Sequence, residues 1–262
     1  MIAAKDDIII APFETEKDVF QANLAISEAF GRQVRDAIWM ALNPGWETEA
    51  GRATSAEEMI KWWKRPSNNK DGKPNTIFLK ATVPDPKEQG ERRVVGVAIW
   101  WQLSTVEGYG ENFKGDMSVP LLRIQDDTHR RFAEQMFRSL WKRRIEYMKE
   151  VAASDRKPPA IFTLELCAVH PDYQRRGIAS RLTQAGLDEA KQRNLECTTE
   201  ASTMGRHVYT RLGFKDEGVG DITWDVDEEF SSWDKPPNVF LRTGYTSKVS
   251  TYLHAYTQLN LE

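Results

Sequence analysis

The stretch VHPDYQRRGIASRL, residues 169–182, joins an apolar segment to an amphipathic one. We expect a strand over 161–169 (IFTLELCAV) and a helix from about 177 to 193. No Ser, Thr, Asp or Asn stands directly before this helix to cap its first N–H groups. Gly177 lacks a Cβ and follows two arginines, so bare N–H groups at a helix N-terminus could receive an anion here. An arginine-rich surface turn is the alternative interpretation.

Composition is that of an ordinary globular protein and excludes several classes. The chain has 262 residues, 40% hydrophobic and 29% charged, which is enough to bury a core. A net charge of −3 gives no basis for nucleic-acid binding, and no apolar run reaches the length of a membrane span. Two cysteines and four histidines show no metal-ligand spacing. We therefore expect a cytoplasmic protein with no metal, no nucleic acid and no membrane partner.

Apolar periodicity elsewhere predicts further strands and helices. Strands are expected over 8–13, 76–83, 94–103, 195–202 and within 214–226, and helices over 16–30, 33–42, 55–65, 128–153 and 204–213, with a loop over 43–52. This order favours an α/β (α+β) fold with a mixed central sheet of about six to seven strands flanked by helices. We expect a single domain over 1–262. The tail 227–262 shows no clear period and is treated as a C-terminal extension.

A strongly charged helical segment at about 126–153 precedes the strand at 161–169. Its alternating Arg, Lys and Glu residues are typical of a solvated face. A lid, an interface and a surface decoration are all open interpretations of it.

Two blocks of residues resemble the GNAT acetyltransferase superfamily. The first is Gln174-Arg175-Arg176-Gly177-Ile178-Ala179, which fits the family's acetyl-CoA signature Gln/Arg-x-x-Gly-x-Gly/Ala between a strand and its following helix. The second runs from Ala201-Ser202 through Gly205 and Val208-Tyr209 to Arg211-Leu212-Gly213-Phe214. The resemblance covers about 161–216 and extends back over 76–103. It implies the GNAT fold and an N-acetyltransferase that uses acetyl-CoA. The helix expected at about 126–153 is an insertion before the cofactor-binding strand, where the family often has only a short connection.

The resemblance also implies which residues bind the cofactor. They are Cys167, Ala168, Val169, Gln174, Arg175, Arg176, Gly177, Ile178, Ala179, Ser180 and Ser202. The strand backbone is expected to pair with the pantetheine arm, and the N–H groups from about Arg175 to Ala179 to bind the pyrophosphate. A backbone N–H near Ala168 or Val169 is expected to hold the oxyanion. Ser202 is expected to bond the pantetheine or to order a water.

Glu165 is the expected catalytic base. Strict alternation would place Thr163, Glu165, Cys167 and Val169 on one strand face and Leu164, Leu166 and Ala168 on the other. A carboxylate in so apolar a strand is costly to bury unless it is paired, and burial makes it a better base near neutral pH. In several relatives that act on small amines, a base occupies this place in the strand. The alternative is a glutamate bridged to an arginine of a neighbouring element.

Tyr209 is the expected general acid. The matching tyrosine in many family members points toward the CoA sulfur and protonates it as it leaves. The alternative is a core tyrosine whose hydroxyl is hydrogen-bonded. His170 and His207 are expected to be surface or turn residues.

The acceptor site is expected in elements within about 15–65 and in the C-terminal extension. Nine tryptophans could line an aromatic pocket for an amine, although most tryptophans are core residues. The leading interpretation is transfer to the primary amine of a small molecule in a ternary complex, by a monomer or homodimer. A protein or peptide N-acetyltransferase and a non-catalytic acyl-CoA-binding module are the alternatives.

Overall fold

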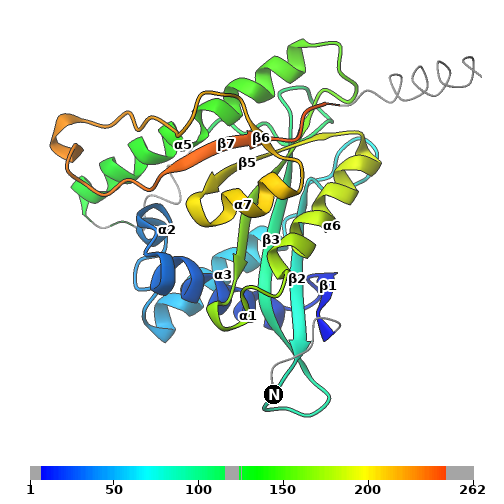
Figure 1. Ribbon diagram of the computed structural model, residues 1–262, viewed down its shortest axis with the longest axis vertical. Helices are drawn as coiled ribbons and strands as arrows, with labels where there is room; N and C mark the ends of the chain where they lie inside the picture. Colours follow the sequence, from blue (N-terminus) through cyan, green and yellow to red (C-terminus); the bar gives the residue numbers. More distant parts are fainter. Residues whose placement is uncertain (1–6, 116–123, 125, 246–262) are drawn as a thin grey trace, which may run out of the picture.

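The computed structural model of the protein describes residues 7–115, 124 and 126–245. Seven strands form one mixed sheet in the order β1-β2-β3-β4-β5-β7-β6 (Figure 1), which confirms the expected fold class. The strands are β1 (Ile9–Pro12), β2 (Thr76–Pro84), β3 (Arg92–Leu103), β4 (Ile161–Val169), β5 (Glu196–Ser202), β6 (Lys215–Asp216) and β7 (Asn238–Arg242).

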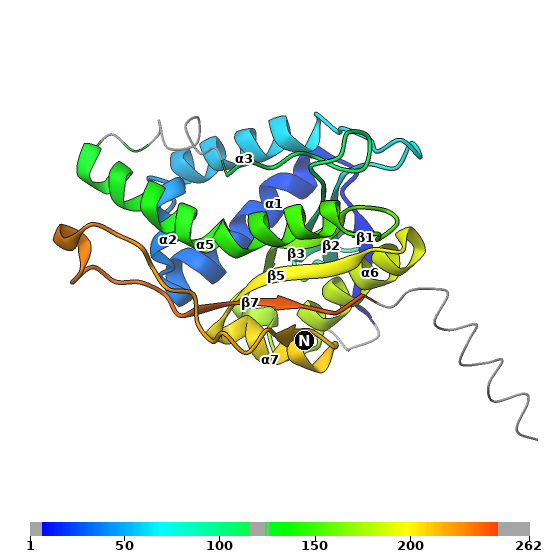
Figure 2. The same cartoon turned by 90° about the horizontal axis from the view of Figure 1, so that it is seen from above.

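Helices cover both faces of the sheet. Figure 2 shows α1, α3 and α5 on one side of it and α6 and α7 on the other. The helices are α1 (Glu16–Ile26), the π-helix η2 (Ser27–Val34), α2 (Ala37–Leu42), α3 (Glu49–Trp63), α5 (Asp127–Ala153), α6 (Ile178–Arg193) and α7 (Thr203–Arg211), with short 3-10 turns η3 (Pro171–Tyr173) and η4 (Glu228–Phe230). The helix α5 is the expected insertion before β4.

Capping side chains set where three of these helices begin. Thr15 and Asp18 form a capping box at the start of α1. Asp36 accepts a hydrogen bond from the backbone of Trp39, so the helix expected over 33–42 begins only at residue 37. Thr48 caps α3 in the same way, so part of the loop expected over 43–52 is helical.

The central pair of strands diverges. The strands β4 and β5 pair in parallel only at Ile161–Thr163, opposite Glu196–Thr198. Beyond that point β5 pairs on its other side with β7, from Thr198 to Ser202. Figure 1 shows β5 and β7 running across the molecule at a large angle to β2 and β3. Among the strands that the structure describes, none therefore pairs with the outer half of β4 on the β5 side.

A β-bulge changes which β4 side chains share a face. Ile99 of β3 pairs with Leu166 and Trp100 pairs with Leu164, so Glu165 is the extra residue. Leu164 consequently joins Cys167 in the core beneath α6 and α7, while Leu166 packs toward α1 and α3. The predicted strict alternation along 161–169 is therefore wrong beyond the bulge.

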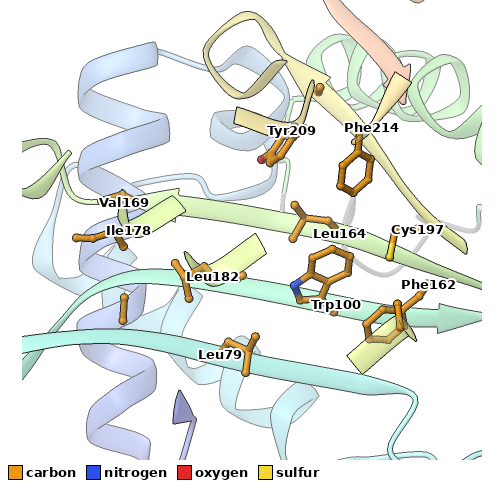
Figure 3. Packing of buried hydrophobic residues seen from close by; sticks show 14 of the residues in the cluster. Leu79, Trp100, Phe162, Leu164, Val169, Ile178, Leu182, Cys197, Tyr209 and Phe214 are labelled. Carbon is orange, nitrogen blue, oxygen red and sulfur yellow. The ribbon is translucent and has the colours of Figure 1, made fainter. Parts of the chain in front are cut away.

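Close packing of α6 against β3 forms the main core (Figure 3). Trp100 is fully buried, and its ring stacks on Phe162 with centroids 5.3 Å apart. A Cβ added at Gly186 would lie 1.9 Å from the Trp100 ring, so only glycine allows this approach.

The last part of the chain differs from the sequence prediction. Only Lys215–Asp216 form a strand within 214–226, where Gly218 and Gly220 have φ angles of 79° and 81°. The tail 227–262 instead supplies β7, which lies between β5 and β6. The remainder of the tail, from residue 246, lies outside the described residues.

Candidate active site

The turn between β4 and α6 presents bare backbone N–H groups. Gly177 is the N-cap of α6, with φ of 77° and no side-chain capping bond, and Arg175 also has a positive φ of 62°. Within the described part of the chain, the N–H groups of residues 175–180 donate to no acceptor. No heavy atom lies within 4 Å of a Cβ built at Gly177, so it is the left-handed backbone that requires glycine there. This is a ready site for an anion.

Side chains of the motif shape the turn. Gln174 donates to the Val169 carbonyl at 3.0 Å and to the Gln33 side chain at 2.7 Å, which ties the turn to β4 and η2. Arg176 donates to the Asp172 carbonyl at 3.0 Å, and its guanidinium lies 4.9 Å from the centre of the Tyr173 ring. These contacts hold the direction in which the chain enters α6.

The other predicted cofactor residues take different places. Ile178 is a core residue, so its N–H is its only group open to a ligand, and Ala179 packs against the same core. Arg175 is exposed and Ser180 is half-buried. Ser202 caps α7 by accepting from the N–H of Gly205 at 3.3 Å, and this helix cap is the role its hydroxyl has in the structure.

The diverging edge of β4 is the second element of the site. Two side-chain donors reach its carbonyls: Thr199 Oγ1 bonds to Leu164 at 3.0 Å, and Gln174 bonds to Val169. Cys167 and Ala168 lie between them, where β5 no longer pairs with β4. An extended ligand with amide groups could pair with this edge.

Tyr209 lies over β4 on the α7 side (Figure 3). Its side chain is 7% exposed, and its hydroxyl interacts with the thiol of Cys167. Burial raises the pKa of Tyr209 well above its ordinary value and raises that of Cys167 to about 11. Both groups therefore keep their protons at neutral pH, so Tyr209 is able to donate one.

Glu165 lies on the opposite face of β4 from Tyr209, where it forms an ion pair with Arg144 of α5. The alternative interpretation of Glu165, a glutamate bridged to an arginine of a neighbouring element, is thus the contact that the structure shows. Arg144 also bonds to Glu200 of β5, and the Arg144 side chain is only 2% exposed. The predicted solvated face of α5 is wrong at this residue.

The sequence analysis missed Arg144 and Glu200. The signal for Glu200 was its spacing from Glu196 along β5, which places both carboxylates on one face of a short apolar strand. Arg144 had no comparable signal, because its helix is rich in arginine on every side.

The tryptophans do not share one pocket. Trp62 and Trp63 line a cavity of about 630 Å³ together with Phe13 and Phe78, but neither Glu165 nor Tyr209 borders it. Trp100, although buried in the core, also borders this cavity. Trp39 does not; its ring stacks on Phe30, with ring centroids 6.3 Å apart.

The two histidines near the site, His170 and His207, lie in a turn and on the surface. His170 accepts from the N–H of Asp172 and caps η3, and His207 is exposed, as expected for turn and surface residues. Across residues 7–115, 124 and 126–245, no three His, Cys, Asp or Glu side chains gather as metal ligands. No helix in the same part of the chain has the length and apolar character needed to cross a membrane.

The mixed sheet and the uncapped turn into α6 agree with the GNAT fold that the sequence resemblance implies. Residues 121–221 match the family model of the acetyltransferase (GNAT) domain. This match identifies an acetyltransferase (GNAT) domain in the part of the chain that holds α5, β4, the uncapped turn, α6, β5 and α7.

Several solved acetyltransferases have a similar fold. Mosquito arylalkylamine N-acetyltransferase like 5b is 13% identical with a TM-score of 0.54, and the match covers 90% of this chain and 98% of that one. Polyamine N-acetyltransferase from Drosophila melanogaster is 10% identical over 90% and 97%, with a TM-score of 0.54. Arylalkylamine N-acetyltransferase 2 from Aedes aegypti is 14% identical over 90% and 97%, with a TM-score of 0.51. At this identity the likeness concerns the fold. No curated protein sequence matches the chain.

Proposed function

We propose that the protein transfers the acetyl group of acetyl-CoA to the primary amine of a small molecule, by direct attack in a ternary complex. The observation that carries the proposal is the uncapped turn at Gly177 beside the diverging edge of β4. The turn offers N–H groups to a pyrophosphate, and the edge offers backbone to a pantetheine arm. Acetyl-CoA supplies the thioester that is broken.

The proposed roles of the side chains follow from their positions. Glu165, at 18% exposure, accepts the proton of the acceptor ammonium directly or through a water. Tyr209 keeps its proton at neutral pH and gives it to the departing sulfur. The two groups lie on opposite faces of β4, so the acceptor approaches from the α5 side and the leaving group is protonated from the α7 side. A backbone N–H near Ala168 holds the oxyanion.

A small amine is favoured over a peptide for two reasons. Solved structures with this fold include enzymes named for arylalkylamine and polyamine substrates. In addition, the net charge of −3 comes without a basic or acidic run suited to a protein tail.

We further propose that residues 1–262 form one domain, supported by a single sheet with strands from Ile9 to Arg242. The two free cysteines support a reducing, cytoplasmic location.

The test is an initial-rate comparison of arylalkylamines, polyamines and amino acids with short peptides, in which the concentrations of the acceptor and of acetyl-CoA are both varied. We expect the highest kcat/KM for a small amine, with intersecting rather than parallel double-reciprocal lines. Acetylation of peptides alone would replace the proposal with the peptide alternative.

A further inference from the structure

We propose that Arg144 and Glu200 are positioning residues for the acetyl transfer, and that they act by holding Glu165 and setting the charge around it. This inference rests on the proposed function, because it assumes that Glu165 is the base. It assigns a part of the reaction to α5, the helix inserted before β4, and to the strand that diverges from β4.

The geometry around Arg144 is a bridge between the two diverging strands. Its Nε and Nη2 atoms donate to the two carboxylate oxygens of Glu200, with Nε at 3.1 Å from Oε1. Its Nη1 atom donates to Oε2 of Glu165. The other oxygen of Glu165, Oε1, accepts no hydrogen bond from any residue that the structure describes. One oxygen of the proposed base is thus held and the other is open.

Arg144 and Glu200 are more deeply buried than Glu165, as positioning residues behind a substrate-accessible base should be. The side chains of Arg144 and Glu200 are 2% and 4% exposed, whereas Glu165 is 18% exposed. The guanidinium also lies near two aromatic rings that contact each other, 5.9 Å from the centre of Phe113 and 5.7 Å from that of Trp141. We call Arg144, Glu165 and Glu200 the cluster. Glu165 is therefore the side chain of the cluster that a substrate can reach, whereas Arg144 and Glu200 are buried behind it.

The charges of the cluster do not cancel. One guanidinium faces two carboxylates, which leaves one negative charge among largely buried groups. Burial raises the pKa of Glu200, against the opposing effect of Arg144, and the neighbouring charge of Glu165 raises it further. Without Glu200, the full positive charge of Arg144 would act on Glu165 and make it a weaker proton acceptor. Glu200 offsets that effect, and the remaining negative charge favours a cationic acceptor.

On η2, which also packs against β4, Arg32 pairs with Glu28 at 2.8 Å. On α5, β5, β7 and the segments beside them, other charged groups and Tyr147 are bonded in a separate network. It lies at the end where β4 and β5 still pair, and its members are Arg143, Tyr147, Glu150, Arg156, Glu196, Glu217 and Arg242. None of them bonds to the three side chains of the cluster. The charged group bonded to Glu165 is Arg144, and Glu200 is bonded to the same guanidinium.

The test compares Glu200→Gln with Glu196→Gln. Both glutamates are buried on the same strand, are bonded to arginine, and lie on the face toward α5. Only Glu200 bonds to the arginine that holds Glu165. We expect Glu200→Gln to move the acid limb of the kcat/KM profile to lower pH by about one unit and to lower kcat several-fold. Glu196→Gln should leave the acid limb in place, although it lowers the melting temperature.

A second variant, Arg144→Lys, keeps the positive charge but loses the planar fork that reaches both carboxylates. We expect kcat to fall about tenfold or more while KM for acetyl-CoA stays unchanged. An unmoved acid limb in Glu200→Gln, or an equal shift in Glu196→Gln, would overturn the inference and leave the cluster as a structural ion pair.

The titration of the Glu165 carboxyl group can be followed by ¹³C NMR in Glu200→Gln and in Glu196→Gln. This measurement compares the two variants without depending on enzymatic activity. We expect the Glu165 signal to titrate at lower pH in Glu200→Gln alone. If wild-type protein acetylates no amine, the proposed function fails, and the NMR comparison still decides whether Glu200 sets the charge around Glu165.

Discussion

Gly177 allows a sharp test of the proposed anion-binding turn, because another glycine matches it in conformation. Gly177 and Gly72 have φ angles of 77° and 76°, and a Cβ at either position meets no atom within 4 Å. The substitutions Gly177→Ala and Gly72→Ala therefore carry the same backbone cost, about 1–2 kcal/mol for a left-handed residue with a side chain. Gly72 lies in the loop before β2, far along the chain from the turn into α6.

The two variants should differ in ligand binding. In Gly177→Ala the turn either keeps its conformation, with a methyl group beside the bare N–H groups, or relaxes and redirects them. A hydrogen bond to a charged group contributes about 1.5–3 kcal/mol, so the loss of one weakens acetyl-CoA binding by about 10- to 100-fold. Gly72→Ala should bind acetyl-CoA as the wild type does.

Isothermal titration with acetyl-CoA measures the affinity, and thermal unfolding measures the shared backbone cost. We expect similar losses of stability in the two variants, about 2–4 °C for each kcal/mol, and a loss of affinity in Gly177→Ala alone. Unchanged affinity in Gly177→Ala would refute the role of the turn, and an equal loss in Gly72→Ala would attribute the effect to general destabilisation.

Three further substitutions test the acid, an ion pair and the core. Tyr209→Phe should lower kcat by about 100-fold or more without changing the Kd for acetyl-CoA, and an unchanged kcat would remove Tyr209 from the mechanism. Hydrogen bonds from Arg143, and also from Arg242, lower the pKa of Glu217 below its ordinary 4.5, although burial opposes them. A lowered pKa contributes stability above about pH 4.5 that is lost as pH falls, so Glu217→Gln should be less stable than wild type by about 1–2 kcal/mol at pH 7. That difference should narrow below pH 4, and a constant gap in urea unfolding would contradict it. Gly186→Ala should cost about 1–3 kcal/mol through its clash with Trp100, and an unchanged melting temperature would show that α6 can move away.

Local features of the sequence were sufficient for most of the fold. The strand at 161–169 and the helix that follows it are marked by apolar periodicity, and the turn between them by Gly177 and the missing cap. Each of these signals arises within a few neighbouring residues, so no knowledge of distant contacts was needed. The same holds for the hairpin of β2 and β3.

Features that depend on distant pairing could not be predicted in this way. The bulge at Glu165 is defined only by the register of β4 against β3, and it reverses the expected faces of the strand. The bridge from Arg144 to Glu165 and Glu200 joins three separate elements. The short strand β7 becomes visible only through its pairing with β5.

The most direct test of the central claim is the product balance of one reaction. Purified protein is mixed with acetyl-CoA and a small primary amine, the CoA thiol is titrated, and the amine product is identified by mass spectrometry. We expect equimolar CoA and N-acetylated amine, with no thiol released when the amine is left out. Thiol release that does not depend on the amine, or an amine that gains no acetyl group while acetyl-CoA binds, would contradict it.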